Sequence, residues 1–176
     1  MPTDERFESS NNVQKRKLFF QKPAIIRLFK TRWCWAACGE MIGSYYNSTA
    51  GCDQTDIVKK IKGNTNDQTG SDGNVCQAVE YALGDSVDFE TVSNALSFSS
   101  AQNEIDGSDP FVAKLVGSSM SHVVVVSGYQ TGTTNYLYVL DPDPGVSGQY
   151  FSYTQMINGA TTDLGTRPYG TTMRRN

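Results

Sequence analysis

The chain has 176 residues, of which 38% are hydrophobic and 11% aromatic, enough for one buried core and unlike a disordered chain. Its net charge of −3 is unevenly spread: residues 1–33 carry eight Lys/Arg against three Asp/Glu, and residues 34–166 carry four against fifteen. An acidic body would repel phosphate, which argues against nucleic acid as a partner. No run approaches the roughly 18 apolar residues of a transmembrane segment.

The N-terminal 30 residues form a basic arm, which we separate from a domain over residues 31–176. We expect no regular structure in residues 1–12, and an extended chain lying over the body in KLFFQKPAIIRLF (17–29), where Pro23 breaks any helix. The arm either packs on its own domain by charge or is a flexible prosegment or translocation signal. Because the N-terminus lacks a charged-then-apolar leader, we expect leaderless secretion or delivery into a host cell, and otherwise a cytoplasmic protein.

Three helices are predicted in the first half of the chain. WCWAACGEMIGSYY (33–46) has apolar or small residues at helical spacing, which indicates a buried helix, and its two glycines would allow close approach of a neighbouring element. CDQTDIVKKIKG (52–63) predicts a short helix with Asp53 as N-cap and Gly63 as its end. NVCQAVEYALG (74–84) predicts the third, after a polar loop that lacks the register of a calcium-binding EF-hand.

The second half has the pattern of strands. Residues rich in β-branched and aromatic side chains predict strands over 87–92, 111–117, 121–130 and 135–142, with a hairpin turn between the last two. A short helix is expected over 99–110, and a strand or strand-to-helix passage over 148–157. Helices followed by strands indicate the α+β class.

Four cysteines raise the question of disulfides or a metal. Two bridges would consume every thiol, and no Cys-x-x-Cys pair is present to favour a four-cysteine zinc site. We expect one bridge, between Cys38 and Cys52, or none.

Cys34 is a candidate nucleophile. It stands where the first helix should begin, between the only two tryptophans of the chain, Trp33 and Trp35. A thiol attacks a carbonyl carbon as the thiolate, and a helix N-terminus or an adjacent imidazolium stabilises that thiolate. Cys38, one helical turn further in, is expected to have a packing role.

His122 is the only histidine, and Asp141 is its expected partner. His122 opens one predicted strand, and Asp141 ends the next strand, in VLDPDPG. In an antiparallel hairpin the start of the first strand lies beside the end of the second, so the topology should bring these two side chains together. The neighbouring carboxylates of DPDPG form a turn, and they could also hold a cation weakly.

These motifs, in this order, resemble the papain-like cysteine peptidases of bacteria. WCWAACGEMIGSYY, HVVVVSGY and YLYVLDPDPG are most similar to avirulence-effector proteases of plant pathogens and to bacteriocin-processing peptidase domains of export transporters. The resemblance covers about Arg32 to Gly148. It implies a helical lobe, with the nucleophile on its first long helix, packed against an antiparallel sheet that carries His and Asp.

The resemblance also implies the chemistry. Cys34 would be the nucleophile, His122 the base and later the acid, and Asp141 the orienting carboxylate of a monomeric protease that cleaves a protein or peptide and needs no metal or organic cofactor. One position departs from the family: Leu28 stands where a glutamine amide usually helps to bind the oxyanion, and Gln21 lies seven residues further upstream. Alternatives are a papain-fold glutamine deamidase, transglutaminase or acyltransferase, or a non-catalytic binding module.

Overall fold

The computed structural model describes residues 5–8, 13–18, 26–46, 51–145, 148–159 and 166–176. The helices of these residues are α1 (Cys34–Tyr46), α2 (Gln54–Lys62), α3 (Asp72–Ala82), α4 (Phe98–Asp106) and α5 (Tyr153–Asn158). The strands are β1 (Glu5–Glu8), β2 (Gln14–Lys17), β3 (Phe89–Val92), β4 (Phe111–Leu115), β5 (His122–Gln130), β6 (Tyr136–Leu140), β7 (Gln149–Ser152) and β8 (Tyr169–Arg175).

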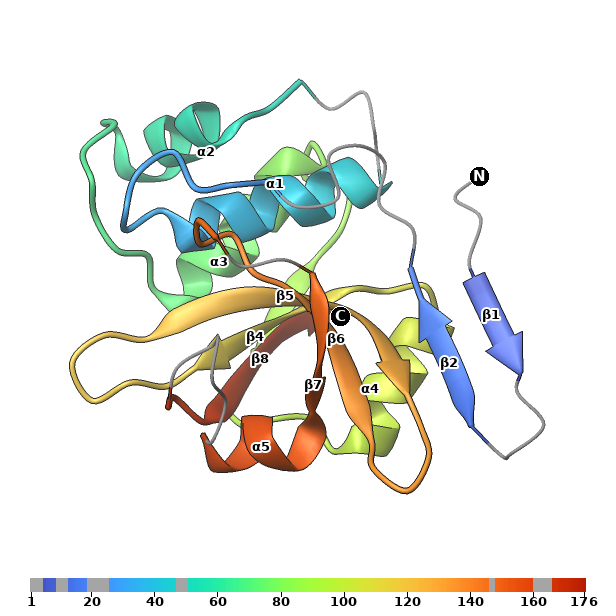
Figure 1. Ribbon diagram of the computed structural model, residues 1–176. Helices are drawn as coiled ribbons and strands as arrows, with labels where there is room; N and C mark the ends of the chain where they lie inside the picture. Colours follow the sequence, from blue (N-terminus) through green and yellow to red (C-terminus); the bar gives the residue numbers. More distant parts are fainter. Residues whose placement is uncertain (1–4, 9–12, 19–25, 47–50, 146–147, 160–165) are drawn as a thin grey trace.

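The helices lie on both faces of one sheet. Figure 1 shows α1, α2 and α3 together above the sheet, with α4 and α5 below it. All eight strands belong to this sheet and every pairing is antiparallel. β5 is the central strand: it pairs with β2, β4 and β6, and eight of its nine residues are buried. A strand that is covered on both faces of the sheet must be apolar along almost its whole length, as β5 is.

The helix α1 packs closely against α3 through small residues. A Cβ atom on Gly39 would lie 2.6 Å from the Cβ of Ala78, and one on Gly43 would lie 2.6 Å from the Cβ of Ala82. Real Cβ atoms do not approach so closely, so the two glycines let the helix backbones come together. This confirms the close approach that the sequence predicts.

The predicted helices and strands of residues 52–157 are confirmed, with bounds that shift by a few residues. Asp53 caps α2 in a capping box with Asp56, and Gly63 ends the helix in the left-handed conformation. The passage at 148–157 contains both a strand, β7, and a helix, α5.

Strands at both ends of the chain were not expected from the sequence. β8 had no prediction, although it lies inside the sheet between β4 and β3. The expectation of no regular structure in residues 1–12 is wrong for Glu5–Glu8, which pairs with β2. β2 in turn pairs with β5, and Leu18 beside it is 1% exposed. The division at residue 30 stays a prediction.

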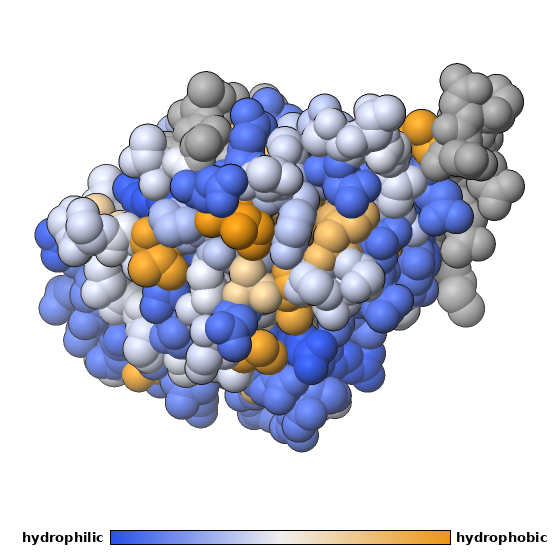
Figure 2. Space-filling view, turned by 90° about the horizontal axis from the view of Figure 1, so that it is seen from below, coloured by the Kyte–Doolittle hydropathy of each residue, from blue (hydrophilic) through white to orange (hydrophobic). Residues whose placement is uncertain are grey.

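Among the described residues, the face away from α1–α3 is mostly hydrophilic, and Figure 2 shows hydrophobic side chains near its middle. None of the described helices combines the length and the apolarity needed to cross a membrane.

Candidate active site

The first turn of α1 presents Cys34 to a cleft between the helices and the sheet. The N–H of Ala37 donates to the carbonyl of Trp33 at 2.9 Å, so the helix begins there and the preceding N–H groups, including that of Cys34, have no acceptor inside it. Cys34 is half-buried and free of disulfides. A thiolate at this place faces the positive end of the helix dipole.

The hairpin of β5 and β6 brings His122 and Asp141 together, as the sequence predicts. Val125 pairs with Leu140, so the chain after Leu140 runs toward the start of β5. Nε2 of His122 lies 2.7 Å from Oδ1 of Asp141, and the two side chains are 7% and 2% exposed. A buried carboxylate on one ring nitrogen fixes the tautomer and leaves Nδ1 for a second partner.

The Cys34 sulfur lines the same cleft as the ring and is the second group that acts on it. Burial alone would lower the pKa of His122, but its hydrogen bonds to Asp141 and Cys34 raise the pKa to about 10. The imidazole therefore holds its proton at neutral pH, between a sulfur and a carboxylate. The structure thus brings together all three residues that the sequence singled out.

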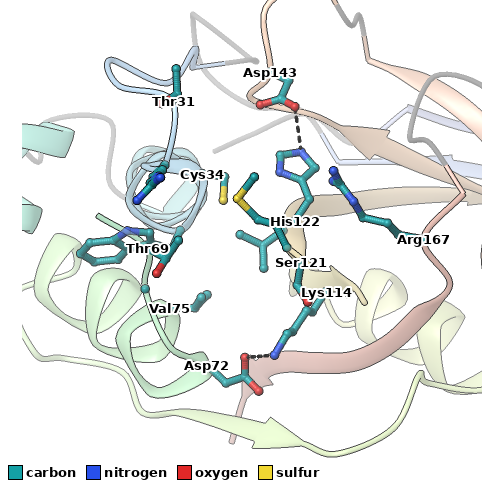
Figure 3. A pocket seen from close by; sticks show the side chains of 15 residues that line it. Thr31, Cys34, Thr69, Asp72, Val75, Lys114, Ser121, His122, Asp143 and Arg167 are labelled. Atoms are coloured by element: carbon teal, nitrogen blue, oxygen red, sulfur yellow. Dashed lines mark hydrogen bonds and ion pairs between the residues drawn. The ribbon is translucent and has the colours of Figure 1, made fainter. Parts of the chain in front are cut away.

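A second carboxylate, Asp143, lies on the same ring. Its Oδ2 is 3.6 Å from Nε2 of His122, and Figure 3 shows it directly beside the imidazole. Its backbone N–H donates to Oδ1 of Asp141 at 2.9 Å, the hydrogen bond of an Asx-turn. The turn thus aims Asp141 at the ring while Asp143, whose side chain is 45% exposed, faces the cleft.

The segment before α1 holds this turn in place. The guanidinium of Arg27 donates to the carbonyl oxygens of Asp141 and Asp143, and the N–H of Leu28 donates to the carbonyl of Pro142 at 3.2 Å. Leu28 therefore contacts the carboxylate turn through its backbone, and its side chain is not among those that line the cleft. Gln21, the other residue considered for the oxyanion, lies outside the described residues.

Both tryptophans hold the loop of residues 64–71 against the start of α1. Nε1 of Trp33 donates to the carbonyl of Asn66 at 3.0 Å, and Nε1 of Trp35 donates to that of Gln68 at 3.2 Å. A Cβ atom on Gly70 would lie 2.5 Å from the indole of Trp35, so the loop backbone rests on the ring. Trp35 therefore forms part of the cleft wall beside the thiol, and Trp33 supports the loop behind it.

The polar loop is tied down by Asp67 as well. Its carboxylate accepts from the hydroxyl of Thr31 at 2.7 Å and from the N–H of Arg32 at 2.8 Å. These hydrogen bonds lower the pKa of Asp67. Thr69 and Gly70 of the loop line the cleft with Cys34 and His122.

The opposite wall of the cleft belongs to the sheet. Lys114 of β4 reaches across to Asp72 at the start of α3, with Nζ 2.6 Å from Oδ1 (Figure 3). Ser121 and Arg167 line the same wall near His122. Lys114 and Arg167 carry no local sequence signal of a role in the site, because only the sheet pairing brings these residues near His122.

The remaining thiols have structural surroundings. All four cysteines are free, so the bridge between Cys38 and Cys52, one of the two alternatives expected from the sequence, is not formed. Sγ of Cys38 donates to the carbonyl of Val123 at 3.5 Å, and burial raises the pKa of this thiol, which the neighbouring Cys34, Asp141 and Asp143 raise further. Cys38 is therefore a protonated packing residue, as expected.

His122, Asp141 and Asp143 are the described residues that could together hold a metal ion. One ligand atom of each lies within 4.8 Å of the others. The hydrogen bonds between His122 and Asp141 and within the turn account for this clustering without an ion. The arrangement fits a nucleophile, a base and an orienting acid.

Comparisons with known proteins give a family and a fold. The sequence model of the Peptidase_C39 like family matches residues 13–162 of the chain. The peptidase domain of Streptococcus ComA, a bifunctional ABC transporter involved in a quorum-sensing pathway, is similar in structure with a TM-score of 0.60 and 19% identity; the match covers 85% of this chain and 94% of that one. A C39-like peptidase from Bacillus anthracis gives a TM-score of 0.58 and 14% identity, over 86% and 93% of the two chains.

No curated protein matches the chain. At the identities of the two solved structures, the likeness concerns the fold. It agrees with the α+β, papain-like arrangement that the sequence predicts, with α1 packed against an antiparallel sheet.

Proposed function

The chain belongs to the Peptidase_C39-like family of papain-like cysteine peptidases, and from this premise we propose that it hydrolyses peptide bonds within protein or peptide substrates through Cys34, His122 and Asp141. The observation that carries the proposal is the chain of contacts from the Cys34 thiol through the His122 ring to the buried Asp141 carboxylate. This order of groups gives a nucleophile, a proton carrier and an orienting acid.

The first half of the reaction forms a thioester. The Cys34 thiolate attacks the scissile carbonyl carbon. The new oxyanion accepts a hydrogen bond from the backbone N–H of Cys34 at the start of α1. His122, as imidazolium, gives its proton to the leaving nitrogen, so the C–N bond breaks and the amine departs. Asp141 keeps the ring in line and stabilises its charge.

The second half clears the thioester. Neutral His122 takes a proton from a water molecule, which attacks the carbonyl carbon, and the C–S bond breaks. The acid product leaves, and Cys34 and His122 return to the thiolate–imidazolium pair. The residue at the family's glutamine position, Leu28, supplies no side-chain donor. Loss of one oxyanion donor costs on the order of 10²–10³ in rate, so we expect slow turnover.

The test compares wild-type protein with Cys34→Ala and His122→Ala on a mixed protein substrate. We expect both variants to lose turnover by about 10⁴-fold or more, because neither half-reaction proceeds without its group. New peptide termini detected by mass spectrometry measure the cleavage. Equal cleavage by Cys34→Ala would refute the assignment.

The same thioester could transfer the acyl group of a glutamine side chain. The family model favours a peptidase activity. Leu28, which stands where the family has a glutamine, is the feature that favours a weaker or altered activity. The mass spectra separate these cases: backbone fragments indicate a protease, whereas a gain of about 1 Da on an intact chain indicates a deamidase.

Delivery outside the producing cell, an effector role and a monomeric state stay predictions. Delivery and the effector role rest on the resemblance to effector proteases and on the polar N-terminal arm, which would suit a translocation signal. Fusing residues 1–30 to a reporter and measuring its export tests the first, and light scattering of the purified protein tests the last.

A further inference from the structure

Arg167 lies at the same edge of the sheet as His122. Leu115 of β4 pairs with His122 on one side and with Tyr169 of β8 on the other, so the residues just before β8 come close to the start of β5. Figure 3 shows the Arg167 side chain pointing into the cleft beside the His122 ring. It lines the cleft together with Cys34 and is half-buried.

The other charged groups of the sheet wall are already paired. Lys114 forms an ion pair with Asp72 at 2.6 Å, and Asp143 lies 3.6 Å from His122. Arg167 has no carboxylate within ion-pair distance in the described part of the chain. A guanidinium held beside the reacting groups without a partner is available to a ligand.

We propose that Arg167 determines the substrate specificity of this site by binding an acidic side chain of the peptide close to the scissile bond. The inference rests on the proposed function, because it takes Cys34 and His122 as the point where the peptide is cut. A guanidinium binds a carboxylate through two parallel N–H···O bonds, which gives both charge and geometry. Asp or Glu fits this geometry, and Lys or Arg at the same place meets like charge.

The surrounding charges sharpen this preference. Residues 34–166 carry only four Lys/Arg against fifteen Asp/Glu, so the part of the chain that forms most of the domain disfavours acidic peptides. Within the cleft, the carboxylates of Asp141 and Asp143 offset the His122 imidazolium, so Arg167 is the group left to attract an acidic residue. An acidic residue is therefore favoured only where the peptide passes the catalytic groups, which provides position as well as selectivity.

Binding to a Cys34→Ala protein tests the inference without turnover. The probes are fluorescent decapeptides centred on a bond that the wild-type protein cuts, or on library sequences if none is cut, with Asp, Ala or Lys at one position at a time. We expect the Asp peptide to bind about three- to tenfold more tightly than the Ala peptide at one position near the bond, and the Lys peptide more weakly. This difference should shrink as salt is raised.

Arg167 variants in the same background show whether this side chain is responsible. Arg167→Gln should bring the Asp and Ala peptides to equal affinity, Arg167→Lys should restore part of the preference, and Arg167→Glu should favour the Lys peptide. Arg175→Gln is the control, because Arg175 lies at the far end of β8 and pairs with Asp109 outside the cleft. Circular dichroism verifies that each variant is folded.

Two outcomes would overturn the inference. One is equal affinity for Asp, Ala and Lys peptides at every position; the other is an Asp preference that Arg167→Glu leaves intact. Failure of the proposed function has a different signature, namely cleavage that survives Cys34→Ala or a complete lack of cleavage by the wild-type protein. The binding preference is measured independently of both.

Discussion

His122 sits between one sulfur and two carboxylates, and this environment governs how its charge depends on pH. Asp141 is buried and hydrogen-bonded to the ring, whereas Asp143 is a longer contact with a half-exposed side chain. The buried pair is therefore the stronger influence, since water screens the exposed carboxylate.

Asp141→Asn should lower the pKa of His122 from its raised value of about 10 toward the ordinary 6.5. Because the imidazolium must protonate the leaving amine, the alkaline limb of kcat/KM should move to lower pH. Activity should fall but persist, since Cys34 and His122 remain. A pH–rate profile measures the shift, and Asp143→Asn should shift the limb less.

The same change affects stability. A histidine whose pKa is raised on folding stabilises the fold fully below pH 6.5, and this contribution is lost as the pH rises through about 10. The unfolding free energy of the wild-type protein should therefore fall between these values. Urea titrations at several pH values should show a flatter curve for Asp141→Asn; an unchanged slope would contradict the role given to Asp141.

The sequence predicts the three central residues because local rules place each one. A helix start fixes Cys34, and one hairpin fixes His122 against Asp141. The roles of Trp33 and Trp35 as supports of the 64–71 loop, and the approach of Arg167, depend on tertiary contacts that no local pattern encodes.

Among the elements, α1 and α3 approach each other closely at Gly39 and Ala78. Gly39→Ala would gain helix propensity but place a methyl group 2.6 Å from the Cβ of Ala78 and 2.9 Å from its carbonyl carbon. We expect a net loss of about 1–3 kcal/mol in unfolding free energy, because backbone cannot move aside cheaply. Urea denaturation measures this loss.

Gly73→Ala in α3 is the matched control. The nearest atom to its added Cβ would be the hydroxyl oxygen of Ser71 at 3.8 Å, so nothing opposes the gain in helix propensity. We expect a stabilisation of up to about 1 kcal/mol. Destabilisation by both substitutions would show that close packing is not what distinguishes Gly39.

The elements that sequence patterns identify best are those with a strong period or run. β5 reads as a strand because of its consecutive valines, and α2 reads as a helix because of its caps. β8, with YGTTMRR, has few apolar residues and no clean alternation, and only its pairing with β4 and β3 makes it a strand. β1 and β2 are likewise mostly polar in sequence, and only their pairing with each other and with β5 makes them strands.

For the molecule as a whole, the N-terminal segment is partly structural. β2 pairs with β5, Leu18 is 1% exposed, and Arg27 holds the turn that carries Asp141. A chain lacking residues 1–12 should keep nearly the full melting temperature, whereas one lacking residues 1–30 should melt lower and lose activity, because it loses buried surface and the support of the turn. Thermal melts and peptide cleavage compare the two.

This pair of deletions also decides whether residues 1–30 are a removable prosegment. An unchanged melting temperature and full activity for the chain beginning at residue 31 would mean that the segment is dispensable. Loss of both, with the chain lacking residues 1–12 unaffected, would mean that residues 13–30 are part of the folded domain.

The Cys38 thiol donates to the carbonyl of Val123, one helical turn below Cys34 and one residue after His122. The helix that carries the sulfur and the strand that carries the ring are thus clamped together directly beneath the reacting atoms. The spacing between Cys34 and His122 is therefore set by a contact inside the core, whereas the loops that line the cleft above them are held by separate contacts. Substitutions in the loops that line the cleft can therefore change which substrates are bound without changing the position of the sulfur relative to the ring.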